Sequence, residues 1–466
     1  MTTGAVTSEA LAALHDEALV AVDTSDEAIA AASRDFGRLC RGVARGSIRP
    51  TTAEQTQRIV RFANERSIRL TLRGRGMSQS GQSIPRDGLT LDVTGLAHIG
   101  EPDLTRMSVT TGPGATWRAL LERLSPLGLA PSVVPLCLDL SVGGTLSAGG
   151  FGSTSHRLGP AVSHVLSANV VTGDGVLRVC GPDRERETFD AVFGGLGCYG
   201  AITSVELGLR RVPPRVRTHF LVYDDMETML QDQLALSRVE GAAHLEGFCA
   251  GTVQGLRKNA SGRRQPLVKW TFGLHVSEEI DGATDARDPA VLSDLHHAAC
   301  VHVEEDTSAE FASRYDVRFA AMRVTGAWDL PHPWLECILS LPAALETLPR
   351  VLEMLPAFLG DGHRLTLLAD TPRPASLAFP SRGPYVSFAI LPMGVPEPLL
   401  RPALEAMQAV HALLVAAGGK RYLSGWLFEP DDNDWRRHHN DAHVALCAAK
   451  AALDPRRVFE SCLIAS

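Results

Sequence analysis

Glycines and arginines crowd the segment Leu72–Gln82, which reads Leu-Arg-Gly-Arg-Gly-Met-Ser-Gln-Ser-Gly-Gln. Glycine lets the backbone turn sharply and bring its N–H groups against an anion. Arg73 and Arg75 add positive charge at the same place. The segment therefore suits a diphosphate ligand, although such a loop alone is a weak signal, because many loops of this kind are plain turns.

Two further glycine-rich runs lie at Leu140–Gly152 and Gly194–Thr203. The first has few bulky side chains and several hydroxyls, so small donors and backbone amides can lie flat against a large planar or phosphorylated ligand. The second mixes glycines with a β-branched strand start. Each run alone reads as a tight loop, but three runs beside strand signals in one chain indicate one long, extended ligand.

A helix and a strand must position the first glycine run. Apolar residues alternate over residues 68–72, which predicts a strand that ends in the loop. Ahead of it, Thr51 and Glu54 have the spacing of a capping box, which predicts that a helix begins there. The apolar residues of this helix share one face: Ile59, Phe62 and Ala63.

The rest of the chain divides at Pro213-Pro214, which form a natural break. Strand and helix signals alternate with glycine turns from Ile48 to Val212, and longer signals follow from Arg215 to about Lys420. Local predictions are a helical N-terminal segment over residues 1–35, a hairpin turn at Gly173–Gly175 and a helix over 403–417.

Composition limits the class of protein. At 466 residues, the chain is long enough for roughly two or three domains. The net charge of −8 gives no basic excess, so we expect no nucleic-acid partner. Nine cysteines without a CxxC pair predict reduced thiols and neither a disulfide framework nor a zinc site.

The N-terminal segment Met1–Val20 lacks a basic start and carries acidic residues, which is unlike a secretory signal. No apolar run approaches the roughly 20 residues that a membrane span needs. These features predict a cytoplasmic enzyme without a membrane partner.

The order of the blocks resembles the flavoproteins with a vanillyl-alcohol-oxidase (PCMH-type) FAD-binding fold, and among them the cytokinin dehydrogenases. The similarity covers nearly the whole chain. Its motifs are Ala32–Gly37, the arginine-glycine loop, Val142–Ser147, His156–Pro160, Gly194–Gly197 with Ile202-Thr203, Gly326–Leu335, Tyr422-Leu423, Trp435 and Asp454-Pro455. The resemblance implies FAD as cofactor and an FAD-dependent oxidoreductase.

The resemblance also implies an α+β fold in three parts. Residues 1–213 are expected to form a two-subdomain PCMH-type FAD-binding domain with its core at about 46–213. Residues 214–420 are expected to form an α+β substrate domain with an antiparallel sheet. Residues 421–466 are expected to return to the FAD-binding domain.

Departures from the family pattern concern the flavin. Met77 stands where the family usually has a histidine bonded to the flavin ring, and methionine cannot form that bond. Relatives with a second bond use a cysteine that matches Cys137, where either a lone cysteine bond or a buried structural thiol remains open. The family's proton-accepting aspartate matches Leu136, which can neither accept a proton nor hold a cation. Ser461-Cys462-Leu463 replace a final Pro-Gly-Gln. We therefore expect non-covalent FAD and altered amine-oxidising residues.

The family's FAD contacts carry over to positions in all three glycine runs and near the C-terminus. Met77 and Leu136 are expected to lie against the flavin as apolar packing residues. The full expected set is Arg73, Gly74, Arg75, Gly76, Met77, Ser78, Gln82, Leu136, Cys137, Ser141, Ser147, Phe151, Ile202 and Tyr422.

No catalytic residue stands out. Asp139 is the carboxylate nearest the missing aspartate, although strand alternation places it on the opposite face from Leu136. His332 lies between Trp328 and Trp334, in a cluster that reads as a pocket wall with a polar handle or, more simply, as a structural turn with core tryptophans. Both residues are candidates for the proton acceptor.

Two other polar patterns have plainer interpretations. The acidic run Glu304–Asp306 reads as a solvated face. His438-His439 have no third partner at metal-ligand spacing and read as helix-surface residues, so no metal is expected.

The pattern as a whole predicts an oxidase or dehydrogenase that takes a hydride from a C–N or C–O bond of a small, largely apolar metabolite. The alternatives are a flavoprotein whose FAD is structural or assists a non-redox cyclisation or elimination, and a binding protein that has lost FAD. A small-molecule substrate and a monomer or homodimer are expected.

Overall fold

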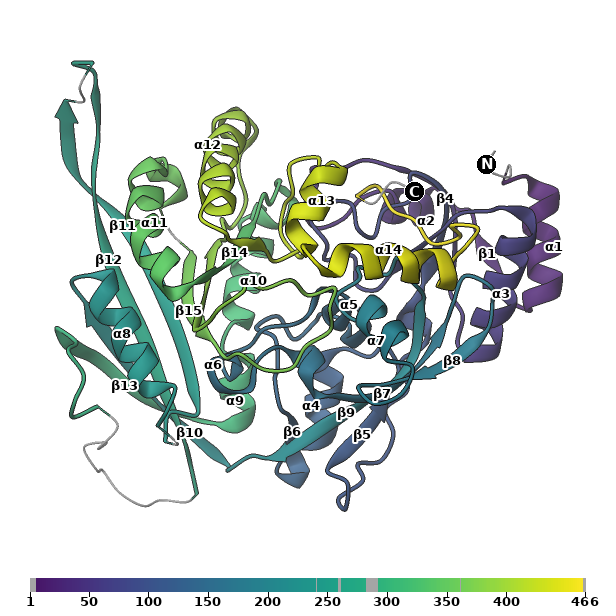
Figure 1. The fold of residues 1–466 in the computed structure, drawn as a ribbon, viewed down its shortest axis with the longest axis horizontal. Coiled ribbons are helices and arrows are strands. Elements are labelled where there is room, and N and C mark those ends of the chain that lie inside the picture. The colour runs from purple at the N-terminus through teal and green to yellow at the C-terminus, as the bar shows by residue number, and fades with distance from the viewer. Residues whose placement is uncertain (1–5, 240, 259–260, 282–291, 361, 464–466) are drawn as a thin grey trace.

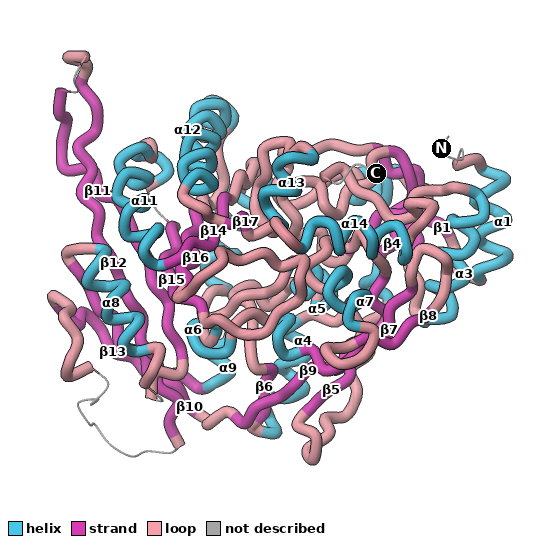
Figure 2. The backbone as a smooth tube through the Cα atoms, in the orientation of Figure 1, coloured by secondary structure: helices cyan, strands magenta, loops and turns pink. Residues whose placement is uncertain are grey.

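The computed structural model describes residues 6–239, 241–258, 261–281, 292–360 and 362–463. Three β-sheets organise this part of the chain. The elements up to β9 lie mainly at one side of the molecule, and the largest sheet with its helices lies at the other (Figure 1). Helices and strands are interspersed throughout (Figure 2). The expected α+β class is confirmed.

A four-stranded sheet positions the first glycine run. Its strands have the order β1 (Val22–Asp23), β2 (Val43–Ile48), β4 (Asp87–Asp92) and β3 (Leu70–Arg73). Strand β4 pairs in parallel with both β2 and β3. Helices α1 (Ser8–Ala18) and α3 (Ala53–Arg66) share one apolar core with this sheet, whereas α2 (Asp26–Ala32) packs beside β2.

The predicted helix before β3 is present, but its N-cap is displaced by one residue. The N-cap is Thr52, whose hydroxyl accepts from the amide of Gln55 at 3.1 Å. The amide of Thr51 donates to Oε1 of Gln55 at 2.8 Å. The helix begins at Ala53, one residue later than expected, and Gln55 accepts from the residue before the N-cap and not from the N-cap amide, so the predicted Thr51–Glu54 box is replaced by a Thr52 N-cap.

A second sheet has the order β5 (Ser108–Thr111), β9 (Ala201–Arg211), β7 (Val165–Val171) and β8 (Leu177–Cys180), with β6 (Leu129–Pro131) paired to β9. All its pairs are antiparallel. The predicted hairpin turn at Gly173–Gly175 joins β7 to β8, with Gly175 at φ +76°. The accompanying helices are α4 (Trp117–Leu124), α5 (Val142–Ala148), α6 (Ser155–Leu158) and α7 (Arg186–Val192).

The largest sheet is antiparallel and has eight strands. Their order is β13 (Ala299–Thr307), β10 (Arg215–Tyr223), β12 (Arg264–Ile280), β11 (His244–Lys258), β15 (His363–Leu368), β16 (Tyr385–Ile390), β14 (Leu335–Ser340) and β17 (Lys420–Arg421). Its helices are α8 (Met226–Leu236), α9 (Ser308–Ser313), α10 (Asp316–Val324), α11 (Leu341–Met354) and α12 (Glu397–Ala416). Pro213-Pro214 separate β9 from β10, where the sequence predicted a break.

Helix α12 begins six residues before the predicted start at 403. Pro398 lies in its first turn, where proline is tolerated, and Pro402 lies within the helix. With 20 residues and a mean hydropathy of 1.2, α12 is long and apolar enough to cross a membrane by length and composition alone, which the sequence analysis did not anticipate. Its buried Ala403, Met407, Val410 and Leu414 pack into the core of the eight-stranded sheet. We therefore assign it as a core helix.

The C-terminal segment contacts two of the sheets. Strand β17 pairs with β14 at the edge of the largest sheet. After α13 (Asp432–His439) and α14 (Ala442–Leu453), the chain reaches β3, where the amide of Leu70 donates to the carbonyl of Val458 at 2.8 Å. Residues 458–460 thus lie beside the strand that leads into the first glycine run.

Candidate functional site

One cavity gathers residues from all three glycine-rich runs, from the C-terminal segment and from strands β11, β14 and β15. It is lined by every residue expected to contact the cofactor: Arg73, Gly74, Arg75, Gly76, Met77, Ser78, Gln82, Leu136, Cys137, Ser141, Ser147, Phe151, Ile202 and Tyr422. Positions up to 349 residues apart in the sequence therefore meet in a single hollow.

The first two glycine runs pack closely against each other just after the end of β3. A Cβ on Gly74 would lie 2.1 Å from Oγ of Ser141, so the second run leaves room only for glycine. Gly76 has φ +68°, a left-handed conformation that side chains rarely adopt. A Cβ there would lie 2.2 Å from the Arg73 guanidinium. The glycines thus permit close backbone approach at two adjacent positions.

Asp35 stabilises the first glycine loop through two hydrogen bonds. Its carboxylate accepts from Oγ of Ser78 at 3.0 Å and from the amide of Gly81 at 2.9 Å. Burial raises the pKa of Asp35, against these hydrogen bonds and the charge of Arg73. Asp35 belongs to the family motif Ala32–Gly37, which by itself predicts no role for this carboxylate.

The second run ends against the C-terminal segment. The hydroxyl of Tyr422 accepts from the amide of Gly150 at 2.9 Å, and its ring contacts Phe151 with centroids 4.7 Å apart. At the start of the run, Oγ of Ser141 caps helix α5 by accepting from the amide of Gly144 at 3.3 Å. This part of the cavity wall therefore joins the second glycine run to the C-terminal segment.

Comparison with known proteins agrees with this geometry. A family described as FAD binding domain matches residues 44–181. Cytokinin dehydrogenase 8 of Oryza sativa subsp. indica is 29% identical over 92% of this chain and 89% of its own length. Cytokinin dehydrogenase 6 of Oryza sativa subsp. japonica is 31% identical over 66% of this chain and 64% of its own length. An uncharacterized oxidoreductase, ORF5 in the fasciation locus of Rhodococcoides fascians, is 26% identical over 94% and 97%. The chain is an FAD-binding flavoprotein that is similar to cytokinin dehydrogenases. It is an FAD-dependent oxidoreductase.

The residues of the flavoprotein's cavity fit FAD. Gln79 lines the cavity, and its buried Oε1 has no protein partner among the described residues, as expected for a group that awaits a ligand. Arg73 is half-buried, and burial lowers its pKa, against the charges of Asp35 and Asp92. The predicted contact Gln82 has a second task, because its Nε2 donates to the carbonyl of Leu423 at 2.7 Å.

Met77 and Cys137 line the flavoprotein's cavity and pack against the same apolar cluster. Both contact a small cluster centred on Phe36 and Phe319. Burial raises the pKa of the Cys137 thiol to about 11, so the thiol is neutral near pH 7. A neutral thiol is a poor nucleophile. This environment favours the interpretation of Cys137 as a structural thiol.

Asp139 is not placed to act in the flavoprotein's cavity. The segment 132–141 is irregular, so the strand alternation used to orient Asp139 does not apply. Its carboxylate pairs with Arg118 at 2.8 Å and is 42% exposed, and it is absent from the cavity lining. This position does not favour Asp139 as the base.

His332 also lies outside the cavity lining. Its ring stacks on Phe36 at 4.0 Å with 4° between the planes, and burial lowers its pKa to about 4. Trp334 lines the cavity, whereas Trp328 packs against Phe36 from outside. The cluster is thus an aromatic core with one cavity-facing tryptophan, and the position of His332 does not favour it as the proton acceptor.

Glu336 on β14 is the carboxylate of the cavity lining that the sequence analysis missed. Its Oε1 accepts from Oγ of Ser424 at 2.7 Å. Burial raises the pKa of Glu336, against this hydrogen bond and the charges of Arg364 and Arg421. A glutamate in the apolar stretch Leu-Glu-Cys-Ile-Leu was the available signal.

A charged cluster lies beside Glu336. Arg364 lines the cavity from β15, and Glu246 on β11 lies 3.9 Å from it and 2.7 Å from Arg314. Although burial acts to raise the pKa of Glu246, these two cations outweigh it and lower the pKa. Glu246 is therefore ionised and paired, which leaves Glu336 as the carboxyl group poised to change its protonation.

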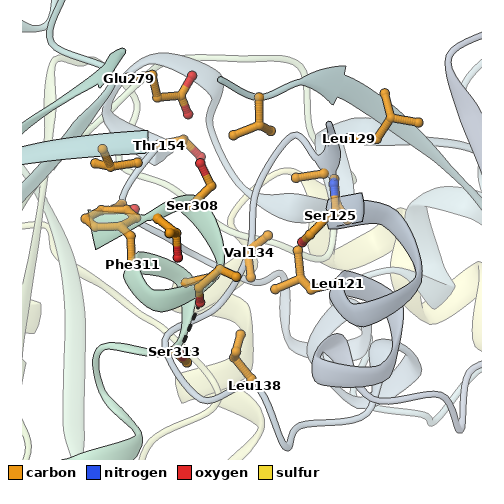
Figure 3. A pocket seen from close by; sticks show the side chains of 18 of the residues that line it. Leu121, Ser125, Leu129, Val134, Leu138, Thr154, Glu279, Ser308, Phe311 and Ser313 are labelled. Carbon is orange, nitrogen blue, oxygen red and sulfur yellow. Dashed lines mark hydrogen bonds between the residues drawn. The ribbon is translucent and has the colours of Figure 1, made fainter. Parts of the chain in front are cut away.

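A second cavity adjoins the first and shares Pro135 and Leu136 with it. In Figure 3, apolar side chains such as Leu121, Val134 and Phe311 face the same hollow as the polar Thr154 and Glu279. At the polar end of this second cavity, His244 links two other lining residues by hydrogen bonds. Its Nδ1 bonds to Oγ of Ser153 at 2.9 Å, and its Nε2 bonds to Glu279 at 3.0 Å.

The weaker polar patterns lie away from the cavity. Glu305 lies on the exposed edge strand β13 and pairs with Arg217, as expected of a solvated face. His438 and His439 are half-buried on α13, and His439 stacks on Trp435 at 5.9 Å, so they are not fully surface residues. Within the described ranges, no three metal-binding side chains come together.

Proposed function

We propose that the flavoprotein oxidises a C–N or C–O bond of a small, largely apolar metabolite, with Glu336 as the proton acceptor and FAD bound without a covalent link. When bound, FAD supplies the two-electron acceptor that takes the hydride. The position of Glu336 carries the proposal, because it is a half-buried carboxyl with a raised pKa in the lining that holds the expected FAD contacts.

Glu336 would take the proton that leaves the substrate nitrogen or oxygen as the adjacent C–H bond gives up its hydride. The substrate thereby loses two electrons and two hydrogens, and the carboxylate gains one proton. A raised pKa makes the carboxylate a stronger base near neutral pH. Ser424 orients the acceptor through its hydrogen bond to Oε1.

The surrounding side chains suit a mostly apolar substrate. Phe248, Phe319, Trp334 and Leu391 line the same cavity as Glu336. Leu136 separates this cavity from the apolar hollow of Figure 3, which offers room for a larger hydrocarbon group. Because several relatives are named cytokinin dehydrogenases, cytokinins are the first substrates to try.

The decisive measurement is flavin reduction under anaerobic conditions by Glu336→Gln. Glutamine keeps the size of the side chain but cannot accept the proton. With a substrate that bleaches the wild-type flavin, we expect the reduction rate to fall by about 10²- to 10⁴-fold, the usual worth of a general base. The visible spectrum should show that FAD is still bound.

Glu405→Gln is the matched control, because Glu405 pairs with Arg401 on the exposed face of α12 and lies outside the cavity lining. Its reduction rate should equal that of the wild type. An unchanged rate in Glu336→Gln would reject Glu336 as the base.

Non-covalent binding is supported by Met77, whose thioether cannot form the family's histidine link, and by the raised pKa of Cys137. After acid precipitation of the holoprotein, we expect all flavin in the supernatant. Colour retained in the pellet would contradict this, and Cys137→Ser would show whether Cys137 holds it.

The alternative is that FAD assists a non-redox cyclisation or elimination, which the replacement of the family's aspartate by Leu136 favours. Substrate turnover without bleaching of the flavin band would support this alternative. Bleaching by substrate excludes it for that substrate.

We also propose the three-part division at about residues 213 and 420, with a PCMH-type two-subdomain arrangement of the first part. The four-stranded and five-stranded sheets before Pro213 support it. A cytoplasmic monomer or homodimer with no nucleic-acid or membrane partner remains our proposal, supported by the net charge of −8. Light scattering on the purified holoprotein tests the oligomeric state.

A further inference from the structure

Neighbouring residues of the C-terminal segment serve two different cavities. Tyr422 and Ser424 line the FAD cavity, whereas Lys420 and Arg421 line another one. Part of the wall of this other cavity comes from the C-terminal half of α12, strand β17 and α13, which Figure 2 shows near one another, and most of the rest comes from neighbouring loops.

Lys420 and Arg421 are buried cations without a carboxylate partner. They are only 8% and 4% exposed. Nζ of Lys420 donates to the main-chain carbonyl of Arg437, and Nε of Arg421 donates to that of Glu336 at 2.9 Å. In the described part of the chain, neither cation has a carboxylate oxygen within 4.0 Å. Lysine and arginine are rarely this buried unless they are paired.

The rest of the lining adds positive charge and apolar surface. Arg382 and Arg437 lie at the exposed rim. Asp434 is the one carboxylate among the described lining residues, and it is already paired with Arg437 at 2.5 Å. The aromatic rings of Phe428 and Trp435 form part of the wall.

We propose that this cavity binds an organic anion, with its carboxylate or phosphate group at Lys420 and Arg421 and an apolar body against Phe428 and Trp435. An anion there would supply the countercharge that two buried cations lack. His411 and His438 also line the cavity, and burial lowers the pKa of both, so each is neutral until an anion favours its protonated form.

The site is coupled to the FAD cavity through Arg421. Its guanidinium binds the main-chain carbonyl of Glu336 and Nδ1 of His411, at 2.9 and 3.0 Å. An anion that attracts this guanidinium would weaken its hydrogen bond to the backbone of β14, the strand that carries Glu336. The binding test below does not depend on the identity of the oxidised substrate.

Calorimetry with the FAD-loaded protein tests the proposal, because FAD then occupies the other cavity. Phenyl phosphate, benzoate and neutral benzyl alcohol are titrated separately. We expect saturable binding of at least one anion and none of the alcohol, and the tighter anion distinguishes phosphate from carboxylate. Lys420→Met should weaken the bound anion at least tenfold. Arg401→Met, at an exposed cation elsewhere on α12, should leave its affinity unchanged.

Absence of heat with both anions at millimolar concentration would overturn the proposal, as would equal affinity of Lys420→Met and the wild type. Circular dichroism checks that Lys420→Met folds. If it does not, Arg382→Ala on the exposed rim serves at low ionic strength. For Arg382→Ala at low ionic strength, a several-fold loss of anion affinity is expected, and an unchanged affinity would also overturn the proposal.

Discussion

The two ends of the FAD cavity are built in different ways. At one end, small residues of neighbouring loops interlock, so that a Cβ on Gly74 would meet Ser141 at 2.1 Å. At the other end, long charged and aromatic side chains converge from separate strands, with Glu336 on β14 and Arg364 on β15. The first end presents backbone, whereas the second presents functional groups.

This difference separates binding from chemistry. Backbone amides at closely packed loops can hold a phosphate chain whatever the reaction, since they change no protonation state. Proton transfer needs a titratable side chain with a shifted pKa, and at the second end Glu336 meets that requirement. Substitutions at the first end should therefore reduce FAD binding, whereas substitutions at the second end should slow flavin reduction.

The largest effect is expected from Gly74→Val. A β-branched side chain at this position would overlap Ser141, which caps helix α5. Purified protein should contain less than about a tenth of the wild-type flavin, because the loop can no longer approach. Gly262→Val is the control, since no described residue lies within 4 Å of a Cβ there, although its φ of +78° adds strain. A yellow, fully loaded Gly74→Val protein would contradict the close-packing account.

The sequence predicted the first end better than the second. Glycine loops show their function locally, and all the expected FAD contacts lie in one cavity. The register of β14 decides that Glu336 faces the cavity, and that register is set by β16 and β17, which follow much later in the chain. Asp139 was chosen by proximity in sequence, and an irregular segment turned it toward Arg118 instead.

The next effect concerns pH at the second end. Because the pKa of Glu336 is raised above its usual 4.5, the rate of flavin reduction should rise with pH, with a midpoint above that value. The folded state holds this proton more tightly than the unfolded state, so the free energy of unfolding should fall as pH rises through the same window. Glu336→Gln should remove both dependences. A rising limb that persists unchanged in Glu336→Gln would assign it to another group.

A smaller effect is expected from Asp35→Asn at the first end. Asparagine keeps the shape but weakens the hydrogen bonds from Ser78 and Gly81. We expect a loss of about 1–3 kcal/mol in the free energy of unfolding, typical of a buried hydrogen-bonded group. FAD affinity should fall while the reduction rate of loaded protein stays the same. Asp87→Asn, at an exposed ion pair with Arg45, is the control and should change little.

The smallest effect is expected from Asp139→Asn, which tests whether Glu336 alone serves as the base. Arg118 keeps its second partner, Asp316, at 2.9 Å, and Asp139 is partly exposed, so the loss should stay within about 1 kcal/mol. The rate of flavin reduction should match the wild type, because the carboxylate faces Arg118 and not the cavity. A loss as large as that of Glu336→Gln would mean that the segment 132–141 rearranges when substrate binds. The proton acceptor would then lie on the loop beside Leu136, and the contrast between a loop end that binds and a strand end that reacts would no longer hold.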